Sequence, residues 1–287
     1  MPSPLELLGA HACFGGEQRF YRHASHTVGL PMRCAVYLPP QALAGARVPA
    51  LLYLAGLTCT EETFPTKAGA QQQAAALGLA LIAPDTSPRG AGLAGEADSW
   101  DFGVGAGFYL DATEAPWRAH WRMESWLLHE LLPLLAQHLP IDAARLGITG
   151  HSMGGHGALT LALRHPGRFK TVSAFAPIAH PVNCPWGEKA FTGYLGADRA
   201  AWGAHDATVL MQNQPMAPYP GGILIDQGLA DKFLIEQQLL PEAFEAACAS
   251  IGQPLTLRRH AGYDHGYYFV QSFMADHLRH HAQGLAP

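Results

Sequence analysis

The stretch that most constrains the fold is Gly150-His151-Ser152-Met153-Gly154. A short apolar run, residues 146–149, precedes it and predicts a buried strand. A run of small and apolar residues, 155–163, follows it and predicts a helix. So tight a turn between strand and helix needs a glycine on each side, because a side chain there would strike the neighbouring elements. Such a turn lifts the Ser152 hydroxyl off the sheet, where a nucleophile is needed.

Strand and helix patterns alternate along the rest of the chain. Strands are expected over residues 33–38, 50–54, 80–83, 146–149, 171–175, 222–225 and 255–260, and helices over residues 68–77, 125–138, 156–164, 235–250 and 267–281. This alternation predicts a mainly parallel central sheet with helices on both faces. With a G-x-S-x-G turn between strand and helix, the pattern is typical of the α/β-hydrolase fold. Residues 85–121 are rich in Gly, Asp and aromatics, and we expect them to form an ordered excursion over the site.

A serine nucleophile in this fold is followed along the chain by an acid and then by a histidine. Asp226 and Asp231 both lie where the strand at residues 222–225 opens into a loop, and the two remain alternatives on position alone. His260 falls within a strand pattern, where a packed or surface histidine is expected. His265 lies in the loop before the last helix and is the favoured base. The backbone N–H of Met153, directly after the serine, is the expected first donor of an oxyanion hole.

The composition limits the other possibilities. No linker or repeat divides the 287 residues, so we expect one domain over residues 1–287. The net charge is −5 with no basic stripe, which disfavours nucleic acid as a partner. No apolar run approaches the roughly 20 residues of a membrane span. The N-terminal residues lack the pattern of a signal peptide, and the five scattered cysteines are expected to be reduced, so we expect a cytoplasmic protein.

Neither a metal nor a cofactor is expected. No C-x-x-C pair occurs, and His277, His280 and His281 are interpreted as the solvated face of a terminal helix rather than as ligands. The glycines of residues 103–107 imitate a dinucleotide loop, but their spacing is wrong and no helix start follows them.

Several long segments resemble one known family. From about residue 32 to residue 281 the chain resembles the S-formylglutathione hydrolases, the esterase D group of the α/β-hydrolases. The matching segments are Gly56-Leu57-Thr58-Cys59-Thr60, Asp85-Thr86-Ser87-Pro88-Arg89-Gly90, Asp98-Ser99-Trp100-Asp101-Phe102-Gly103, Gly105-Ala106-Gly107-Phe108-Tyr109, the stretch 150–159 around Ser152, Cys184-Pro185-Trp186-Gly187 and Gly262-Tyr263-Asp264-His265.

The resemblance implies a reaction and a set of roles. It implies hydrolysis of S-formylglutathione to formate and glutathione in formaldehyde detoxification, through an acyl-serine, in a homodimer. The family pattern Q-G-x-x-D-x-F-L, here residues 227–234, selects Asp231 as the acid. The resemblance also points to the Leu57 N–H as the second oxyanion donor. Gly266 departs from the family, which usually has a serine after the histidine, but this change removes no triad member.

Other residues of the matched segments are candidates for the substrate pocket. Cys59, two residues beyond Leu57, is expected beside the site as a bystander, because the turn serves Ser152. Trp186 is expected to line the acyl pocket, although a core tryptophan would give the same pattern. Glutathione carries two carboxylates, so a cation at the rim would help to bind it. The candidates are Lys67, Arg89 and Lys189, with Lys189 placed in the pocket, and the sequence does not rank the three.

Two other functions remain as alternatives. A short-acyl carboxylesterase, or an acyltransferase of the related mycolyltransferase branch, would use the same triad on other acyl donors or acceptors. A non-catalytic interaction protein of the same fold would be expected to lack a triad member, and all three residue types are present here.

Overall fold

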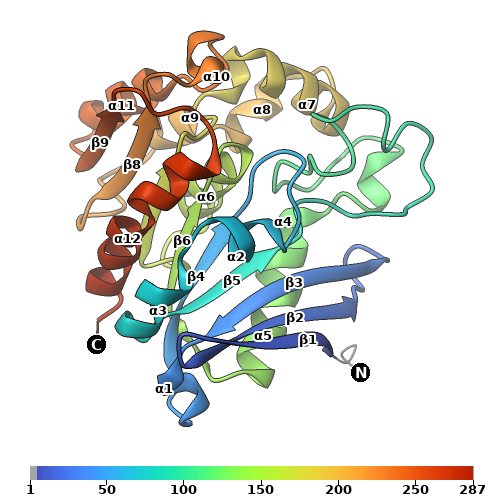
Figure 1. Cartoon of the computed structure of the whole chain (residues 1–287). Coiled ribbons are helices and arrows are strands. Elements are labelled where there is room, and N and C mark those ends of the chain that lie inside the picture. Colours follow the sequence, from blue (N-terminus) through green and yellow to red (C-terminus); the bar gives the residue numbers. More distant parts are fainter. Residues whose placement is uncertain (1–4, 287) are drawn as a thin grey trace.

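A nine-stranded sheet runs through the chain from Glu6 to His260 (Figure 1). The computed structural model describes residues 5–286. The strands are β1 (Glu6–Cys13), β2 (Gly16–Ala24), β3 (Pro31–Leu38), β4 (Val48–Leu54), β5 (Ala80–Pro84), β6 (Ile141–Gly150), β7 (Thr171–Phe175), β8 (Ile223–Gly228) and β9 (Leu255–His260). All seven expected strands are present, and β1 and β2 are additions at one edge.

The sheet is antiparallel at one edge and parallel elsewhere. The strands lie in the order β1-β2-β3-β5-β4-β6-β7-β8-β9. β1, β2 and β3 pair antiparallel, and β3 is antiparallel to β5. From β5 to β9 every neighbouring pair is parallel, which confirms the mainly parallel sheet. Because parallel strands end at the same edge, the loops after β4, β6, β8 and β9 are brought together there.

Helices cover both faces of this sheet. In Figure 1, α2, α3 and α12 lie in front of the sheet, whereas α5 and α6 lie behind it. α12 packs on β7 and β8, and α6 packs on β4, β6 and β7. The helices are α1 (Pro40–Leu43), α2 (Thr63–Lys67), α3 (Gln71–Leu77), α4 (Met123–Ser125), α5 (Leu132–His138), α6 (Met153–Arg164), α7 (Pro185–Leu195), α8 (Arg199–Trp202), α9 (Ala207–Gln212), α10 (Lys232–Ile235), α11 (Pro241–Ser250) and α12 (Tyr267–Gly284). A π-helical turn, Trp126–Leu131, joins α4 to α5, and 3₁₀ turns cover Trp117–Ala119, Pro181–Asn183 and Gly203–His205.

Two of the expected helices begin later than expected. Of the helix expected over residues 68–77, α3 covers residues 71–77, and Gly69 before it has a φ of +61°. Of the helix expected over residues 235–250, α11 covers residues 241–250, and Leu240 before it has a φ of +51°. Pro241 explains the start of α11, because proline has no N–H for the preceding turn and is favoured at the first position of a helix.

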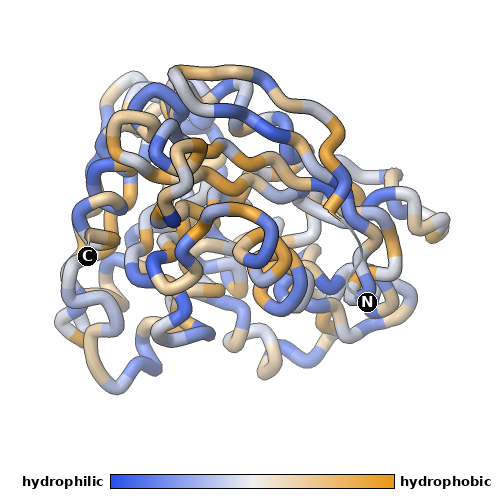
Figure 2. The backbone as a smooth tube through the Cα atoms, turned by 90° about the horizontal axis from the view of Figure 1, so that it is seen from below, coloured by the Kyte–Doolittle hydropathy of each residue, from blue (hydrophilic) through white to orange (hydrophobic). Residues whose placement is uncertain are grey.

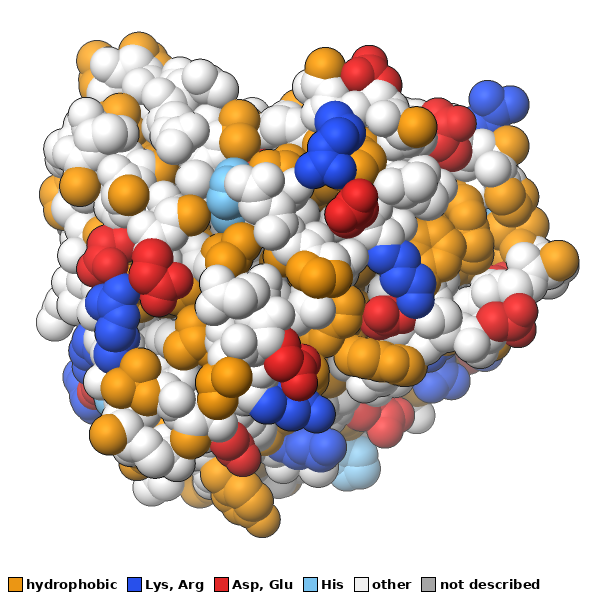
Figure 3. All heavy atoms as spheres, turned by 90° about the horizontal axis from the view of Figure 1, so that it is seen from above, with side chains coloured by type: hydrophobic (Ala, Val, Ile, Leu, Met, Phe, Trp, Pro, Cys, Tyr) orange, Lys and Arg blue, Asp and Glu red, His pale blue; other side chains and the backbone are white. Residues whose placement is uncertain are grey.

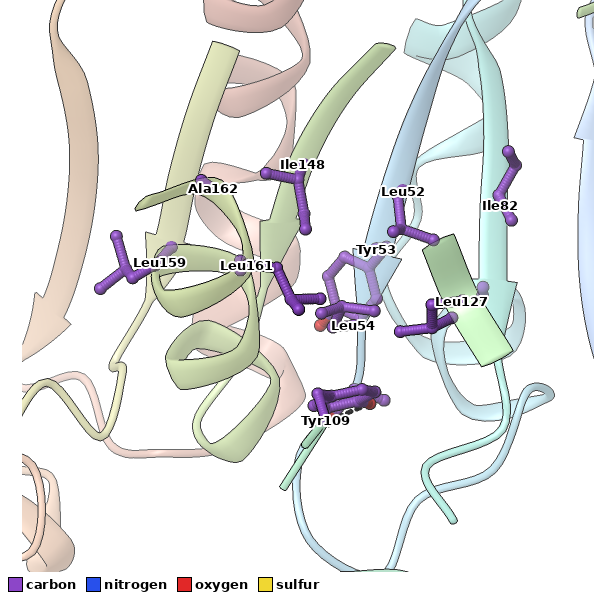
Figure 4. Close-up of a cluster of buried hydrophobic side chains, with 14 of the residues drawn as sticks. Leu52, Tyr53, Leu54, Ile82, Tyr109, Leu127, Ile148, Leu159, Leu161 and Ala162 are labelled. Carbon is purple, nitrogen blue, oxygen red and sulfur yellow. Dashed lines mark hydrogen bonds between the residues drawn. The ribbon is translucent and has the colours of Figure 1, made fainter. Parts of the chain in front are cut away.

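The core lies between the sheet and the helices. Figure 4 shows one part of it, where Leu161 of α6 faces Ile148 of β6 and Tyr53 of β4. All three side chains are completely buried. Burying one such aliphatic side chain contributes about 1.5–3 kcal/mol. Tyr109, from the irregular excursion over residues 85–121, donates its hydroxyl hydrogen to the carbonyl of Ala55 at 2.8 Å, which ties that excursion to the loop after β4.

The C-terminal helix corrects one expectation. His277 and His281 are buried rather than solvated. The His281 ring contacts the hydroxyls of Thr171 and Ser173 at 2.6 and 2.8 Å, and the His277 ring contacts Ser173 at 2.8 Å. The expectation was wrong because sequence spacing shows which residues share a helix face, but not whether that face is covered. Here polar groups on β7 supply the partners that buried imidazoles need.

Hydropathy follows this arrangement. In Figure 2 the central strands are largely hydrophobic, and many of the outer turns are hydrophilic. Within residues 5–286, no helix is both long enough and apolar enough to cross a membrane. Residues 1–4, on which part of the signal-peptide expectation rests, and residue 287 lie outside the described residues.

Candidate active site

The serine lies in a strained turn between β6 and α6. Its backbone has φ +59° and ψ −120°, a conformation that few non-glycine residues adopt. A Cβ on Gly150 would lie 2.1 Å from the Gly154 carbonyl oxygen, and one on Gly154 would lie 1.9 Å from the Leu54 carbonyl oxygen. Both glycines are therefore required, for the steric reason inferred from the sequence.

Asp231 and His265 are in direct contact. The loop after β8 carries Asp231, and the loop after β9 carries His265. The His265 Nδ1 lies 2.5 Å from Asp231 Oδ2. The same carboxylate accepts hydrogen bonds from Gln227 Nε2 at 3.1 Å and from the Phe233 N–H at 2.8 Å. Three donors thus hold a completely buried carboxylate against the imidazole.

The alternative acid, Asp226, has other partners. Its oxygens accept two hydrogen bonds from Arg258, both at 2.6 Å, and contact ring nitrogens of His260 and His277 at 3.1 Å. Burial favours the neutral acid, but hydrogen bonds from His277, Arg258 and His260 outweigh it and hold the pKa of Asp226 well below its usual value. His260 is the packed histidine expected from its strand, and its ring stacks on Phe273 at 3.8 Å.

Ser152 and His265 line the same cavity, which has a volume of about 270 Å³. Leu57, Cys59 and Trp186 also line it, so these three residues of the matched segments come together with the serine and the histidine. Burial raises the pKa of the Cys59 thiol, which does not favour its use as a nucleophile. Trp186 packs edge-on against Trp100, with 5.7 Å between the ring centroids.

Lys189 was expected in this pocket but does not line it. Its ammonium group pairs with Asp101 and donates a hydrogen bond to Ser99 Oγ at 2.8 Å. Arg89 is likewise engaged elsewhere, because it pairs with Asp85 at 2.8 Å. Of the three cations considered from the sequence, Lys67 is the one that lines the cavity.

The loop after β4 lies next to the serine. A Cβ on Gly56 would lie 3.1 Å from the Cβ of Ser152, so the Leu57 peptide is held next to the nucleophile. Two side chains fix the continuation of this loop: Thr86 and Arg89 donate hydrogen bonds to the Cys59 carbonyl at 2.5 and 3.0 Å. Within residues 5–286, the N–H groups of Leu57 and Met153 have no hydrogen-bond acceptor. Both N–H groups are therefore unoccupied.

Some residues of the cavity wall carried little signal in the sequence. Phe233 packs edge-on against the His265 ring at 4.8 Å between centroids. Tyr267 lines the cavity from the first turn of α12, and only its place directly after the histidine loop suggested this position. His151 was expected to pack, and its buried ring lies 4.5 Å from that of His265, between centroids. Burial lowers the pKa of His151 well below its usual value.

The described residues, 5–286, contain no group of three or more His, Cys, Asp or Glu side chains that could hold a metal ion. A mainly parallel sheet covered on both faces, with a serine in a strained strand-to-helix turn at its carboxyl edge, defines an α/β-hydrolase.

Comparisons with known proteins identify the family. The model of the family "Putative esterase" matches residues 25–280. An S-formylglutathione hydrolase from Mus musculus is 54% identical over 284 residues, covering 98% of this chain and 99% of that protein. One from Paracoccus denitrificans is 55% identical over 280 residues, covering 98% of each chain. The chain therefore belongs to the S-formylglutathione hydrolase family of esterases.

Solved structures agree with this assignment. The structure of an S-formylglutathione hydrolase from Agrobacterium tumefaciens matches with a TM-score of 0.94 and 47% identity, covering 98% of this chain and all (100%) of that one. A ferulic acid esterase matches with a TM-score of 0.73 at 17% identity, covering 96% of this chain and 100% of that one, and it shares the fold alone.

Proposed function

We propose that this protein hydrolyses S-formylglutathione to formate and glutathione, a step in formaldehyde detoxification, through an acyl-serine intermediate. One observation carries the proposal. The contact of 2.5 Å between Asp231 and His265 lies beside a cavity that Ser152 also lines, in a chain whose relatives over nearly its whole length are S-formylglutathione hydrolases.

In the first half of the reaction Ser152 is the nucleophile. His265 takes the proton of the serine hydroxyl as the Oγ–carbon bond forms, because an unassisted serine is a weak nucleophile. Asp231 holds the imidazole in the tautomer that leaves Nε2 free to accept this proton, and it stabilises the imidazolium that results. His265 then gives the proton to the glutathione sulfur as the carbon–sulfur bond breaks.

In the second half, water attacks the formyl-serine carbonyl while His265 accepts a proton from that water. The serine leaves with this proton and formate is released. Both tetrahedral intermediates carry a negatively charged oxygen, and the free N–H groups of Leu57 and Met153 are the donors that we assign to it. Losing one such donor typically costs about 3–4 kcal/mol of activation free energy.

The cavity wall supports a small acyl group. Trp186 is buried and lines the cavity, so we assign it to the wall that limits the length of the acyl chain. Met153, directly after the serine, has a completely buried side chain that is not part of the cavity lining, so the role that we assign to it is confined to its backbone N–H. Cys59 is assigned to the pocket wall as a bystander.

Three further points extend the proposal. One domain over residues 1–287 is supported by the sheet that joins Glu6 to His260 through neighbouring strands. A cytoplasmic location is supported by the cysteines, all five of which are free thiols. A homodimer is what the family resemblance implies, and sedimentation of the purified protein tests it.

The decisive experiment compares the hydrolysis of S-formylglutathione with that of p-nitrophenyl acetate by the wild type and Ser152→Ala. We expect the wild type to have the larger kcat/KM for the thioester. We expect the variant to lose about 10⁶-fold in kcat on both substrates, while its circular dichroism spectrum remains that of the wild type. A variant that kept a tenth of the activity would exclude Ser152 as the nucleophile. Preference of the wild type for nitrophenyl esters would instead favour a general short-acyl esterase.

A further inference from the structure

The cavity beside Ser152 is almost free of charged side chains. Aromatic groups form much of its wall, including Trp100, Trp186 and Tyr267. Among residues 5–286 no Asp or Glu lines it, and apart from the histidines Lys67 is the only basic side chain of that range that does. A bound molecule in this cavity therefore meets one full positive charge and no negative one.

Lys67 also lacks an anionic partner. Its ammonium group makes no ion pair or hydrogen bond with any of residues 5–286 and lies over the Tyr267 ring, 5.9 Å from the centroid. By contrast, Arg89 and Lys189 are paired with Asp85 and Asp101. On the face that Figure 3 shows, basic side chains generally lie beside acidic ones, so an unpaired cation at a cavity is unlike its surroundings.

The fold gives Lys67 a fixed place at this cavity. It is the last residue of α2, and Thr63 one turn earlier in the same helix also lines the cavity. The charge of Lys67 reaches Cys59, where it lowers the thiol pKa, although burial of the thiol has the larger and opposite effect. The lysine thus acts electrostatically on the wall next to the oxyanion loop. Because Lys67 makes no hydrogen bond to Ser152 or His265, we assign it to the part of the substrate that does not react.

The place of Lys67 at the cavity indicates which part of the substrate it meets. Among the lining residues Ser152 is buried, whereas Lys67 is exposed at the rim. With the reacting thioester carbon at Ser152, the peptide portion of glutathione must extend toward that rim. That portion carries two carboxylates and one ammonium group, so its net charge is negative.

We propose that Lys67 binds a carboxylate of the glutathione portion of the substrate and is the residue that selects an anionic leaving group. This inference rests on the proposed function and deepens it. An ion pair that forms equally in the bound substrate and in the transition state contributes uniform binding, which lowers KM and leaves kcat unchanged. Screening by salt must weaken the effect, because the pair lies near solvent.

The test uses Lys67→Met, with Lys170→Met as the matched control. Lys170 is an exposed lysine next to β7 and does not line the active-site cavity. We expect Lys67→Met to raise the KM for S-formylglutathione about tenfold with little change in kcat, which corresponds to about 1.4 kcal/mol. The KM for p-nitrophenyl acetate, and for the formyl thioester of glutathione diethyl ester, should change less than about twofold. Lys67→Arg should restore most of the affinity, and Lys170→Met should behave as the wild type.

Two further readouts separate binding of the anion from general damage. The inhibition constant of S-methylglutathione, a non-reacting anion, should rise with the KM in Lys67→Met, and the difference from the wild type should shrink as sodium chloride is added. An unchanged KM for S-formylglutathione would overturn the proposal, and so would an equal loss with the neutral substrates. If the wild type itself failed to cleave S-formylglutathione while cleaving nitrophenyl esters, the proposed function would be wrong, whatever Lys67 does.

Discussion

Replacing Asp231 by asparagine is expected to remove catalysis while leaving the fold in place. The Asp231 carboxylate faces three donors: His265 Nδ1, Gln227 Nε2 and the Phe233 N–H. An asparagine amide offers one oxygen in place of two, so at least one of these donors must face an NH₂ group. The negative charge that stabilises the imidazolium is lost in every orientation. By analogy with a serine protease triad, kcat should fall about 10⁴-fold, which corresponds to about 5.4 kcal/mol of activation free energy.

The matched control is Asp226→Asn, which removes the other buried carboxylate of the same strand and loop. Asp226 lies outside the cavity, and its loss leaves Arg258 with Asp276 as its remaining acidic partner, at 2.8 Å. Breaking a buried ion pair costs about 3–5 kcal/mol, and because the Arg258 side chain is 30% exposed we expect the lower end of that range. The folded fraction of this variant should keep a kcat within a few-fold of the wild type.

Two measurements distinguish the two carboxylates. Steady-state kinetics should rank Asp231→Asn far below Asp226→Asn, whereas urea unfolding should rank their stabilities in the opposite order. Equal kinetic losses in the two variants, or a greater kinetic loss in Asp226→Asn, would refute the assignment of the acid.

Three other outcomes are expected. In the wild type, kcat/KM should fall steeply from acetyl to hexanoyl esters, because a methylene forced into a packed wall costs about 1–3 kcal/mol. Trp186→Ala should relax this preference for short acyl groups. Equal wild-type rates on the two esters would contradict the small acyl pocket. A bulky maleimide on Cys59 should block turnover, whereas Cys59→Ser should keep most activity; a labelled enzyme with full activity would place the thiol away from substrate. Burial holds the pKa of His281 well below its usual value, so its imidazole stays neutral in the folded protein but takes up a proton below about pH 6.5 in the unfolded chain. The free energy of unfolding should therefore fall on acidification by up to about 1.4 kcal/mol per pH unit for this group. Urea titrations at about pH 7.5 and about pH 5.5 should show a smaller loss of stability in His281→Gln than in the wild type, and an equal loss would count against the argument.

The start of α11 at Pro241 illustrates what one-dimensional patterns miss. The apolar spacing predicted one helix over residues 235–250, and the later start was available in the sequence as a proline at position 241. The positive φ of Leu240, directly before this helix, is a tertiary outcome. β1 and β2 were missed for a different reason. β1 is an edge strand that is largely exposed, so it lacks the apolar pattern that a buried face imposes.

The turn around Ser152 was determined by the sequence, because its constraint is local: two glycines whose missing side chains leave room for backbone at 2.1 and 1.9 Å. The strand patterns before the loops that carry Asp231 and His265 were likewise present in the sequence, and the parallel order of β8 and β9 places both loops at the same edge of the sheet. Tertiary structure alone decided which charges are free. Lys67, Arg89 and Lys189 looked equivalent in the sequence, yet two of them are paired with Asp85 and Asp101 and one faces the cavity. Tertiary structure likewise decided that His277 and His281 are buried, because the hydroxyls that bond to them lie more than a hundred residues away in the chain. Sequence spacing fixes which side chains share a face of an element, whereas their partners depend on how distant elements pack.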